Sequence, residues 1–293
     1  MNDDFIIMCD NLVKIFKTSD TEVMALQGLD LTARRAELMG IIGASGSGKS
    51  TLLNIIGGLD TPTMGSVTVD GIDLRKMNRA DLSAYKRDTI GFVWQNNARN
   101  LVPYLTAQEN VDLVGRIGRR LDKKYTWRLI DLVGLAGRRK NKLSQLSTGE
   151  QQRVAIAIAL ANKPRILLAD EPTGSVDTRT TIEIMKLFEL LRNELGITII
   201  IVSHDQEVAR HVDRVIAIRD GQTSSEILRT ELIGNRSDLS AFSEEETMEL
   251  AVVDRSGRVQ IPAELLKQLS IANKSKVHID VEDKKITIYP VDV

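Results

Sequence analysis

The segment that most restricts the fold of this chain is MGIIGASGSGKSTLLNIIGGL, residues 39–59. Its pattern predicts a short apolar strand over residues 39–42, a glycine-rich loop over residues 43–48, and a helix from Lys49. Glycine N–H groups in such a loop can surround phosphates, and the N-terminus of the helix adds its partial positive charge. The alternative, a glycine-rich turn without a ligand, does not account for the strand before the loop and the helix after it.

Several side chains of this loop have specific predicted roles. Lys49 is expected to act as a catalytic residue that reaches the β- and γ-phosphates of a nucleotide. The hydroxyl of Ser50 is expected to bind Mg²⁺. The predicted nucleotide-binding residues of the loop are Gly43, Ala44, Ser45, Gly46, Ser47, Gly48, Lys49, Ser50 and Thr51.

Phosphoryl transfer also needs an acidic magnesium ligand and a group that polarises water, and RILLADEP, residues 165–172, offers both. Its apolar run, residues 166–169, is typical of a strand buried on both faces. Asp170 at the end of this strand is the predicted magnesium ligand, and Glu171 is the predicted catalytic residue beside the attacking water. The alternative is that the two acids only cap the next segment.

A third apolar run, GITIIIVSHD over residues 196–205, ends in Ser203 and His204. His204 is the histidine that follows a strand expected to lie beside the other two strand ends. It is therefore predicted to contact the γ-phosphate as a catalytic residue, with a purely structural histidine as the alternative. We interpret His211 and His278 as surface or packing residues.

Bulk composition excludes other classes of protein. Apolar residues make up 42% of the 293-residue chain and charged residues 27%, which is typical of a globular protein with a buried core. The net charge of −1 provides no general attraction to nucleic acid or anionic lipid. The apolar runs are shorter than the roughly 18 residues of a membrane span, and the start MNDD lacks the features of a signal peptide. A single cysteine excludes an intramolecular disulfide.

Further motifs occur in the order of a known family, and residues 5–222 resemble the ATP-binding subunit of an ABC transporter. The resemblance implies an α/β fold, a P-loop ABC-type ATPase domain with a helical subdomain over about residues 96–162, with ATP and Mg²⁺ as ligands. Within the family, TLLNIIGGLDTPTMGSVTVDG and ALQGLDLT resemble the branch of macrolide exporters, lipoprotein-releasing ATPases and cell-division ATPases. The residues that carry the implied roles are Phe16 under adenine, Gln95 on ATP and Mg²⁺, Ser147, Thr148, Gly149 and Glu150 in the signature, and Asp177 in the loop that crosses to the second subunit.

Thr148 departs from the family pattern, because LSTGEQQR has threonine where the signature normally has glycine. A β-branched side chain there costs backbone freedom if φ must be positive. It also places a methyl group close to the nucleotide, although its hydroxyl is a potential phosphate donor. We expect a working but slower site.

In this family each ATP lies between the phosphate loop of one subunit and the signature of the other. The chain has one copy of each motif, so the resemblance implies a dimer of this chain or a dimer with a related ATPase. It also implies an integral membrane permease as a partner, which would hold the chain on the cytoplasmic face of the membrane. Tyr104 and Leu105 are candidate contacts for that permease, or they pack internally.

The C-terminal part has a different pattern. Residues 223–247 are a predicted linker, and residues 248–293 resemble the mainly-β swapped-hairpin fold of the AbrB/SpoVT family in VVDRSGRVQIP, AELLKQLSI and KVHIDVEDKKITIYPV. About 45 residues are too few to bury an independent core, so two chains are expected to pair.

Two functions of this C-terminal part remain open, a clamp that holds two subunits together and a DNA-binding module. Its seven lysine and arginine residues balance seven aspartate and glutamate residues, whereas a DNA-binding surface needs a basic excess. We therefore expect the clamp and no DNA binding. The competing class for the whole chain is a soluble ATP-dependent factor that binds nucleic acid through its C-terminal part. The single ATPase unit, without a coiled-coil or zinc-bearing insertion, favours transport.

Overall fold

The computed structural model describes residues 4–17, 21–95, 100–118, 120–174, 176–229, 247–253, 257–259, 261, 263–269, 271, 277–282 and 285–290. It divides into two compact units, Met1–Leu250 and Ala251–Val293.

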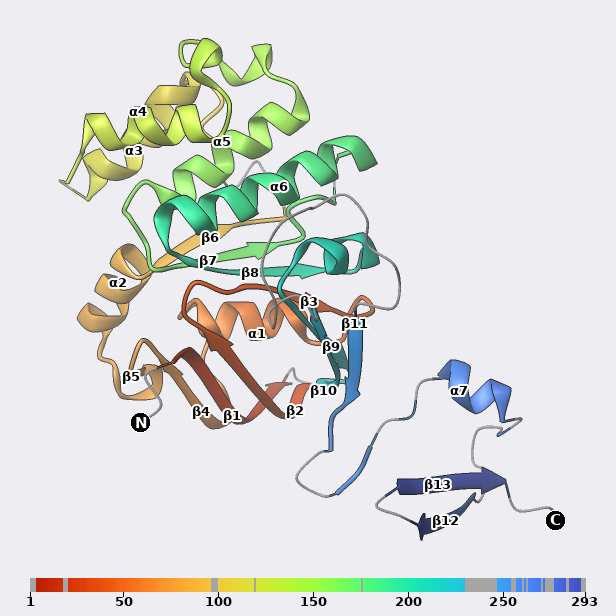
Figure 1. Cartoon of the computed structure of the whole chain (residues 1–293). Coiled ribbons are helices and arrows are strands. Elements are labelled where there is room, and N and C mark those ends of the chain that lie inside the picture. Colours follow the sequence, from red (N-terminus) through yellow and green to blue (C-terminus); the bar gives the residue numbers. More distant parts are fainter. Residues whose placement is uncertain are drawn as a thin grey trace. The chain divides into compact units, whose positions relative to one another are not determined.

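The first unit is built on a seven-stranded sheet in the order β11-β10-β9-β3-β8-β7-β6 (Figure 1). The five strands from β9 to β6 are parallel, and β10 is antiparallel to β9. This order places β8 between β3 and β7, so the ends of the three strands named by the sequence motifs are neighbours. The strands are β3 Leu38–Ile42, β6 Ile90–Val93, β7 Ile166–Asp170, β8 Thr198–Ser203, β9 Arg214–Arg219, β10 Gln222–Arg229 and β11 Thr247–Ala251.

Both faces of this sheet are covered, which explains its continuous apolar runs. Along β8, Ile200 and Val202 pack towards α1, whereas Ile199 and Ile201 pack towards α5 and α6. The alternation follows from the two-residue period of a strand. The helices around the sheet are α1 Lys49–Ile56, α2 Arg79–Asp88, α3 Ala107–Ile117, α4 Lys123–Leu132, α5 Thr148–Leu160 and α6 Thr178–Leu195, with short 3₁₀ turns at Leu74–Lys76, Ala136–Arg138, Leu143–Gln145 and Gln206–His211.

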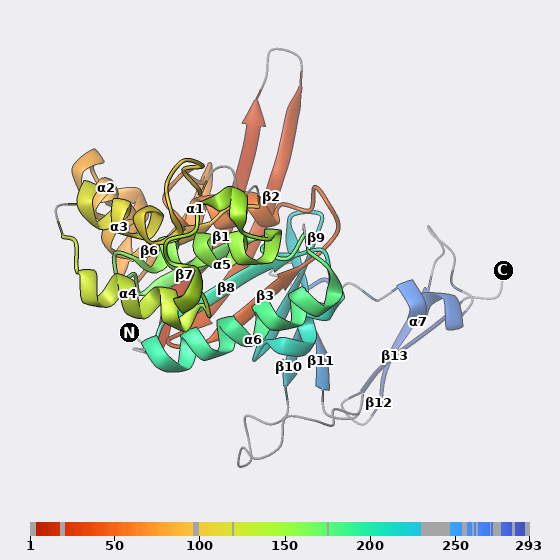
Figure 2. The same cartoon turned by 90° about the horizontal axis from the view of Figure 1, so that it is seen from above.

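A second, antiparallel sheet in the order β2-β1-β4-β5 lies on the other side of α1 (Figure 1). Leu52 and Ile56 of α1 share one core with Ile7 of this sheet and Ile41 of the large sheet. The helix that follows the phosphate loop is thus held between two sheets. Figure 2 shows that the paired ends of β1 and β2 extend away from this core. The strands are β1 Phe5–Lys17, β2 Glu22–Arg34, β4 Met64–Val69 and β5 Ile72–Asp73.

The α/β class predicted from the sequence is confirmed, and the helical pattern over residues 121–135 corresponds to α4. One difference concerns the expected linker, because residues 223–229 form most of β10 and pair with β9. Ile227 in that strand packs against the core, so pairing and burial make this segment a strand. No helix in the described part of the chain is long and apolar enough to span a bilayer.

The second unit contains helix α7, Ala263–Gln268, and an antiparallel hairpin of β12, Val277–Glu282, and β13, Lys285–Pro290. Pairing places Ile279 opposite Ile288 and Val281 opposite Ile286, so these four residues share one face of the hairpin. Ile279, Val281 and Ile286 are 59%, 70% and 69% exposed. Among the described residues, three of the four side chains on this apolar face are therefore mostly exposed.

Candidate nucleotide site

Three predicted site segments meet at one edge of the large sheet. The register pairs Ile42 with Ser203 and Asp170 with Val202, so β3, β8 and β7 end at almost the same level. The loop after β3, the Asp170–Glu171 pair and the Ser203–His204 pair are thereby brought together. Sequence pattern predicted each strand, and the parallel pairing brings their ends together.

The glycine-rich loop leads directly into α1. Gly48 is the N-cap of this helix at φ +100°, and no side chain caps the helix. A Cβ at Gly48 would lie 2.4 Å from the carbonyl oxygen of Ala25, so only glycine fits there. The uncapped N–H groups of the first turn are donors for an anion.

A hollow of about 380 Å³ lies beside this helix start. The residues that line it come from the loop, from the segment after β6 and from the ends of β7 and β8. They are Ala25, Ser45, Gly46, Gly48, Lys49, Ser50, Thr51, Gln95, Glu171 and His204. Seven of the predicted ATP-binding residues and all three predicted catalytic residues therefore line one space.

Lys49 is buried at the base of the loop, with 6% of its surface exposed. Its Nζ donates to the carbonyl oxygens of Gly43 and Ala44, both at 2.8 Å. Burial lowers the pKa of Lys49, and the nearby carboxylates of Glu171 and Asp170 oppose that change. Burial disfavours the charged form of Lys49, and a phosphate anion in the hollow would stabilise that form.

Ser50 and Asp170 form a pair of oxygen ligands, because Ser50 Oγ donates to Asp170 Oδ1 at 3.1 Å. Burial raises the pKa of Asp170, while this hydrogen bond lowers it. Mg²⁺ prefers such hydroxyl and carboxylate oxygens, so these residues fit the metal. The hydroxyl of Ser47 is also buried, and within the described structure it has no hydrogen-bond partner. A nucleotide–metal complex would supply groups that these side chains lack.

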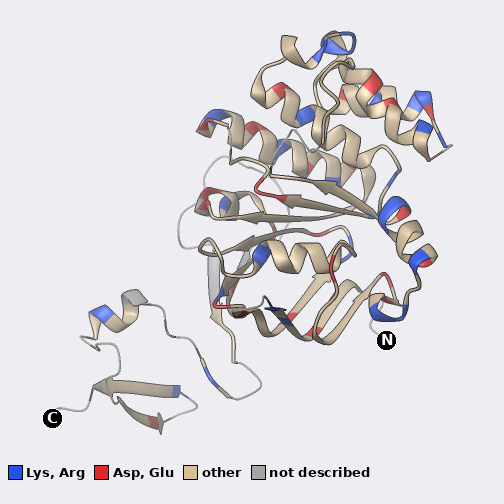
Figure 3. Cartoon of the chain, turned by 180° about the vertical axis from the view of Figure 1, so that it is seen from behind, with Lys and Arg blue, Asp and Glu red and all other residues tan. Residues whose placement is uncertain are grey.

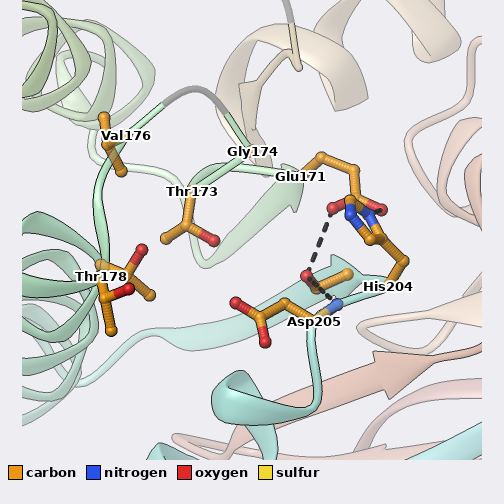
Figure 4. Close-up of a pocket in the computed structure, with 9 residues that line it drawn as sticks. Glu171, Thr173, Gly174, Val176, Thr178, His204 and Asp205 are labelled. Carbon is orange, nitrogen blue, oxygen red and sulfur yellow. Dashed lines mark hydrogen bonds and ion pairs between the residues drawn. The ribbon is translucent and has the colours of Figure 1, made fainter.

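Glu171 is held by two side chains from the end of β8 (Figure 4). His204 Nδ1 lies 2.9 Å from Glu171 Oε1, and Ser203 Oγ donates to Glu171 Oε2 at 3.2 Å. The N–H of Asp205 donates to Ser203 Oγ at 3.0 Å, so the hydroxyl hydrogen of Ser203 points at the carboxylate. Glu171 also has φ +48°, a conformation that costs a non-glycine residue about 1–3 kcal/mol. The carboxylate is thus fixed at the edge of the hollow in a strained but well-supported position.

On the other side of Glu171 lies a second, polar hollow of about 410 Å³ (Figure 4). Its lining combines the end of β8 with the segment that leads from β7 into α6. The residues are Glu171, Thr173, Gly174, Val176, Thr178, Thr181, Ser203, His204 and Asp205. Sequence reasoning assigned no role to Ser203, although its position at a polar strand end was the available signal.

The signature segment forms the start of α5. Ser147 is the N-cap: its Oγ accepts the N–H of Glu150 at 3.2 Å, and Glu150 Oε2 accepts the N–H of Ser147 at 2.8 Å. Thr148 is the first residue of the helix and is not among the described residues with positive φ. The backbone cost considered for a threonine at this position therefore does not arise. Ser147 and Thr148 are exposed.

The remaining predicted residues lie apart from the loop hollow, except Gln95, which is exposed and lines it. Asp177 is the N-cap of α6. Phe16, on β1, is 42% exposed, and the Nζ of Lys14 lies 4.9 Å from its ring centroid. Neither Asp177 nor the segment from Ser147 to Glu150 is among the described residues that line the loop hollow.

Comparison with known proteins gives two family matches. A family described as "ABC transporter" matches residues 26–174. A family described as "Antidote-toxin recognition MazE, bacterial antitoxin" matches residues 250–293. The two matches fall in separate parts of the chain.

Individual relatives agree with the first match. The macrolide export ATP-binding/permease protein MacB of Rhodopirellula baltica is 42% identical over 235 residues, covering 78% of this chain and 34% of that protein, so the chain spans about a third of its length. The lipoprotein-releasing system ATP-binding protein LolD of Pseudoalteromonas translucida is 38% identical over 222 residues, covering 75% and 95%. A solved dimeric structure of the ATP-binding cassette MJ0796 of Methanocaldococcus jannaschii, in a post-hydrolysis state bound to ADP and Pi, matches with a TM-score of 0.67 and 41% identity, covering 75% of this chain and 97% of that one.

Proposed function

This chain belongs to the ABC transporter family as an ATP-binding subunit, and on that premise we propose that it drives a separate integral membrane permease. It is an ATPase, as the related cassette in a post-hydrolysis state indicates. The observation that carries the proposal is the grouping of Lys49, Ser50, Gln95, Glu171 and His204 around one hollow. The permease would place the chain on the cytoplasmic face of the membrane.

The residues of the site have different proposed roles in ATP binding and hydrolysis. Loop N–H groups and Lys49 hold the phosphates, and Phe16 stacks under the adenine. Ser50, Asp170 and Gln95 would hold Mg²⁺, which would offset the negative charge of the phosphates. Glu171 polarises the attacking water, and His204 contacts the γ-phosphate.

A dimer completes this site. The signature residues and Asp177 do not line the loop hollow, so we propose that they act on the nucleotide of a second subunit. Closure of the dimer then completes two nucleotide sites, and opening of the dimer separates their two halves again. This cycle would convert ATP hydrolysis into movement of the permease. The partner subunit is a second copy of this chain or a related ATPase.

Glu171→Gln tests this function. Its side chain is similar in size but lacks the charge that polarises water, so turnover should fall about a hundredfold or more while ATP binding and a closed dimer persist. Lys49→Ala should instead weaken ATP binding itself. Wild-type turnover in Glu171→Gln would contradict the assigned role. Affinity purification from native membranes should recover an integral membrane protein, whereas recovery of DNA or ribosomes alone would contradict the transporter proposal.

For the C-terminal part we propose an AbrB-like hairpin domain that clamps two chains together. Ile279, Val281 and Ile286 are exposed on one apolar face together with the half-buried Ile288, and the same face of a second copy would cover them. Figure 3 shows lysine and arginine interspersed with aspartate and glutamate over the first unit. In the sequence from Met248 on, seven basic residues balance seven acidic ones. The proposed ATPase domain extends beyond residue 222 to include β10, because residues 223–229 pair with β9, and the proposed clamp lies within residues 251–293. Paired tails would keep two ATPase domains at high local concentration after ATP is released.

Two changes test the clamp. A chain that ends at Ala251 keeps β11 in the large sheet and loses the hairpin. We expect weaker dimerisation without nucleotide and a higher ATP concentration for half-maximal turnover, measured by analytical ultracentrifugation and steady-state kinetics. Val281→Lys on the apolar face should have the same effect, whereas Thr287→Lys on the opposite face should not. Unchanged dimerisation together with salt-sensitive DNA binding through the tail would contradict the clamp.

A further inference from the structure

The first turns of α5 and α6 touch through Thr180. A Cβ on Gly149 would lie 2.7 Å from Cγ2 of Thr180, so the methyl group packs directly on the Gly149 backbone. Gly149 belongs to the signature segment. No larger residue fits at position 149 unless Thr180 moves. The first turns of the two helices are therefore in close van der Waals contact here.

Thr180 also holds the carboxylate of Asp177. Its N–H donates to Asp177 Oδ1 at 3.0 Å, and its hydroxyl donates to Oδ2 at 2.9 Å. Both carboxylate oxygens are therefore bound by one residue. These two bonds lower the pKa of Asp177, so its carboxylate stays ionised at neutral pH. The backbone bond alone would cap the helix, and the hydroxyl bond fixes the carboxylate further.

We propose that Thr180 is a positioning residue that locks the Asp177 loop and the signature segment into one rigid unit. Both segments then reach the nucleotide of the second subunit in a fixed relation to each other. This inference rests on the proposed dimer, in which both segments act across the interface. One turn further on, Arg153 of α5 pairs with Glu183 of α6 at 2.9 Å, a second contact between the same two helices.

Two variants separate the contacts that Thr180 makes. Thr180→Ser keeps the hydroxyl bond to Asp177 and removes the methyl contact with Gly149. Thr180→Val keeps the methyl contact and removes the hydroxyl bond, and both variants keep the backbone N–H. The full-length protein is assayed for Mg-ATP hydrolysis, for ATP affinity and for thermal unfolding. Dimer closure is followed by adding each change to Glu171→Gln.

We expect each variant to lower kcat about fivefold, in line with one lost hydrogen bond or an equivalent packing contact. ATP affinity should stay within about twofold, because neither contact reaches the loop hollow. ATP should also drive dimer closure less well in both variants. Thr180→Ala removes both contacts. Because the loss of either contact already releases the same unit, we expect its kcat to be close to that of the less active of the two single-contact variants.

The outcomes separate this inference from the function on which it rests. If wild-type protein hydrolyses ATP and Glu171→Gln closes as a dimer, the proposed function stands. The Thr180 variants then test whether Thr180 positions the Asp177 loop and the signature segment. Wild-type kcat in both Thr180→Ser and Thr180→Val would contradict the positioning role of Thr180. A loss of kcat that only follows lower thermal stability or lower ATP affinity would overturn it as well. If wild-type protein forms no ATP-dependent dimer, the proposed dimer function fails, and the inference fails with it.

Discussion

Ser203 supports the catalytic carboxylate, and a matched pair of substitutions measures how much that support contributes. Ser203 is 1% exposed, and its hydroxyl receives the N–H of Asp205 and donates to Glu171. Ser203→Thr keeps the hydroxyl, whereas Ser203→Val replaces it with a methyl group. Threonine and valine have nearly the same shape, so the strain of adding a methyl group in this tight site is common to both.

The expected size of the effect follows from the geometry. A hydrogen bond to a charged group contributes about 1.5–3 kcal/mol. This bond is long at 3.2 Å, and Glu171 keeps its contact with His204 at 2.9 Å, so the lower end of that range applies. Because about 1.4 kcal/mol corresponds to a tenfold rate change, kcat for Ser203→Val should be about tenfold below kcat for Ser203→Thr.

Steady-state hydrolysis of Mg-ATP measures this ratio, with ATP affinity as the second readout. We expect similar ATP affinity for both variants, because Ser203 does not line the loop hollow. In a Glu171→Gln background the two variants should turn over equally slowly, since the charge that the hydroxyl supports is gone. Equal kcat for Ser203→Val and Ser203→Thr in an otherwise wild-type chain would refute the reasoning.

Two further predictions concern the loop and the base of the sheet. Gly48→Ala should abolish binding of a fluorescent ATP analogue, because its Cβ would meet the Ala25 carbonyl oxygen at 2.4 Å. Gly71→Ala, also at positive φ but in open space, is the control that should keep binding. Arg214→Met should lower the free energy of unfolding by about 3 kcal/mol, because the buried Glu37, now 2.6 Å from Arg214 Nε, loses its charged partner and keeps the N–H of Arg34 as a donor. Chemical denaturation checks this, and a change below about 1 kcal/mol would contradict it.

The strands and the phosphate loop could be predicted from the sequence because their determinants are local. Residues 166–169 and 199–202 are apolar without alternation, which suits strands covered on both faces. The glycines of residues 43–48 allow a backbone that other residues resist. These patterns were sufficient to place Lys49 at the start of a helix, and Asp170, Glu171 and His204 at strand ends.

The segment after β9 was harder to predict. Residues 223–229 were expected to be linker, yet they form most of β10, and β11 adds a further strand to the same sheet. A polar strand such as β10 has weak periodicity of its own, so its conformation depends on the neighbours with which it pairs. Which strands pair with β10 depends on the strand order of the whole sheet, which local sequence does not determine.

By itself, the sequence determined the nucleotide loop, the residue types at each strand end and the α/β class, because glycine, charge and apolar runs act on their own neighbourhood. The tertiary structure alone decided which strand ends meet. Buried apolar strands are chemically interchangeable, so their order is set by packing and chain connections rather than by local pattern. For that reason only the folded chain placed Ser203 against Glu171 and Thr180 between Gly149 and Asp177.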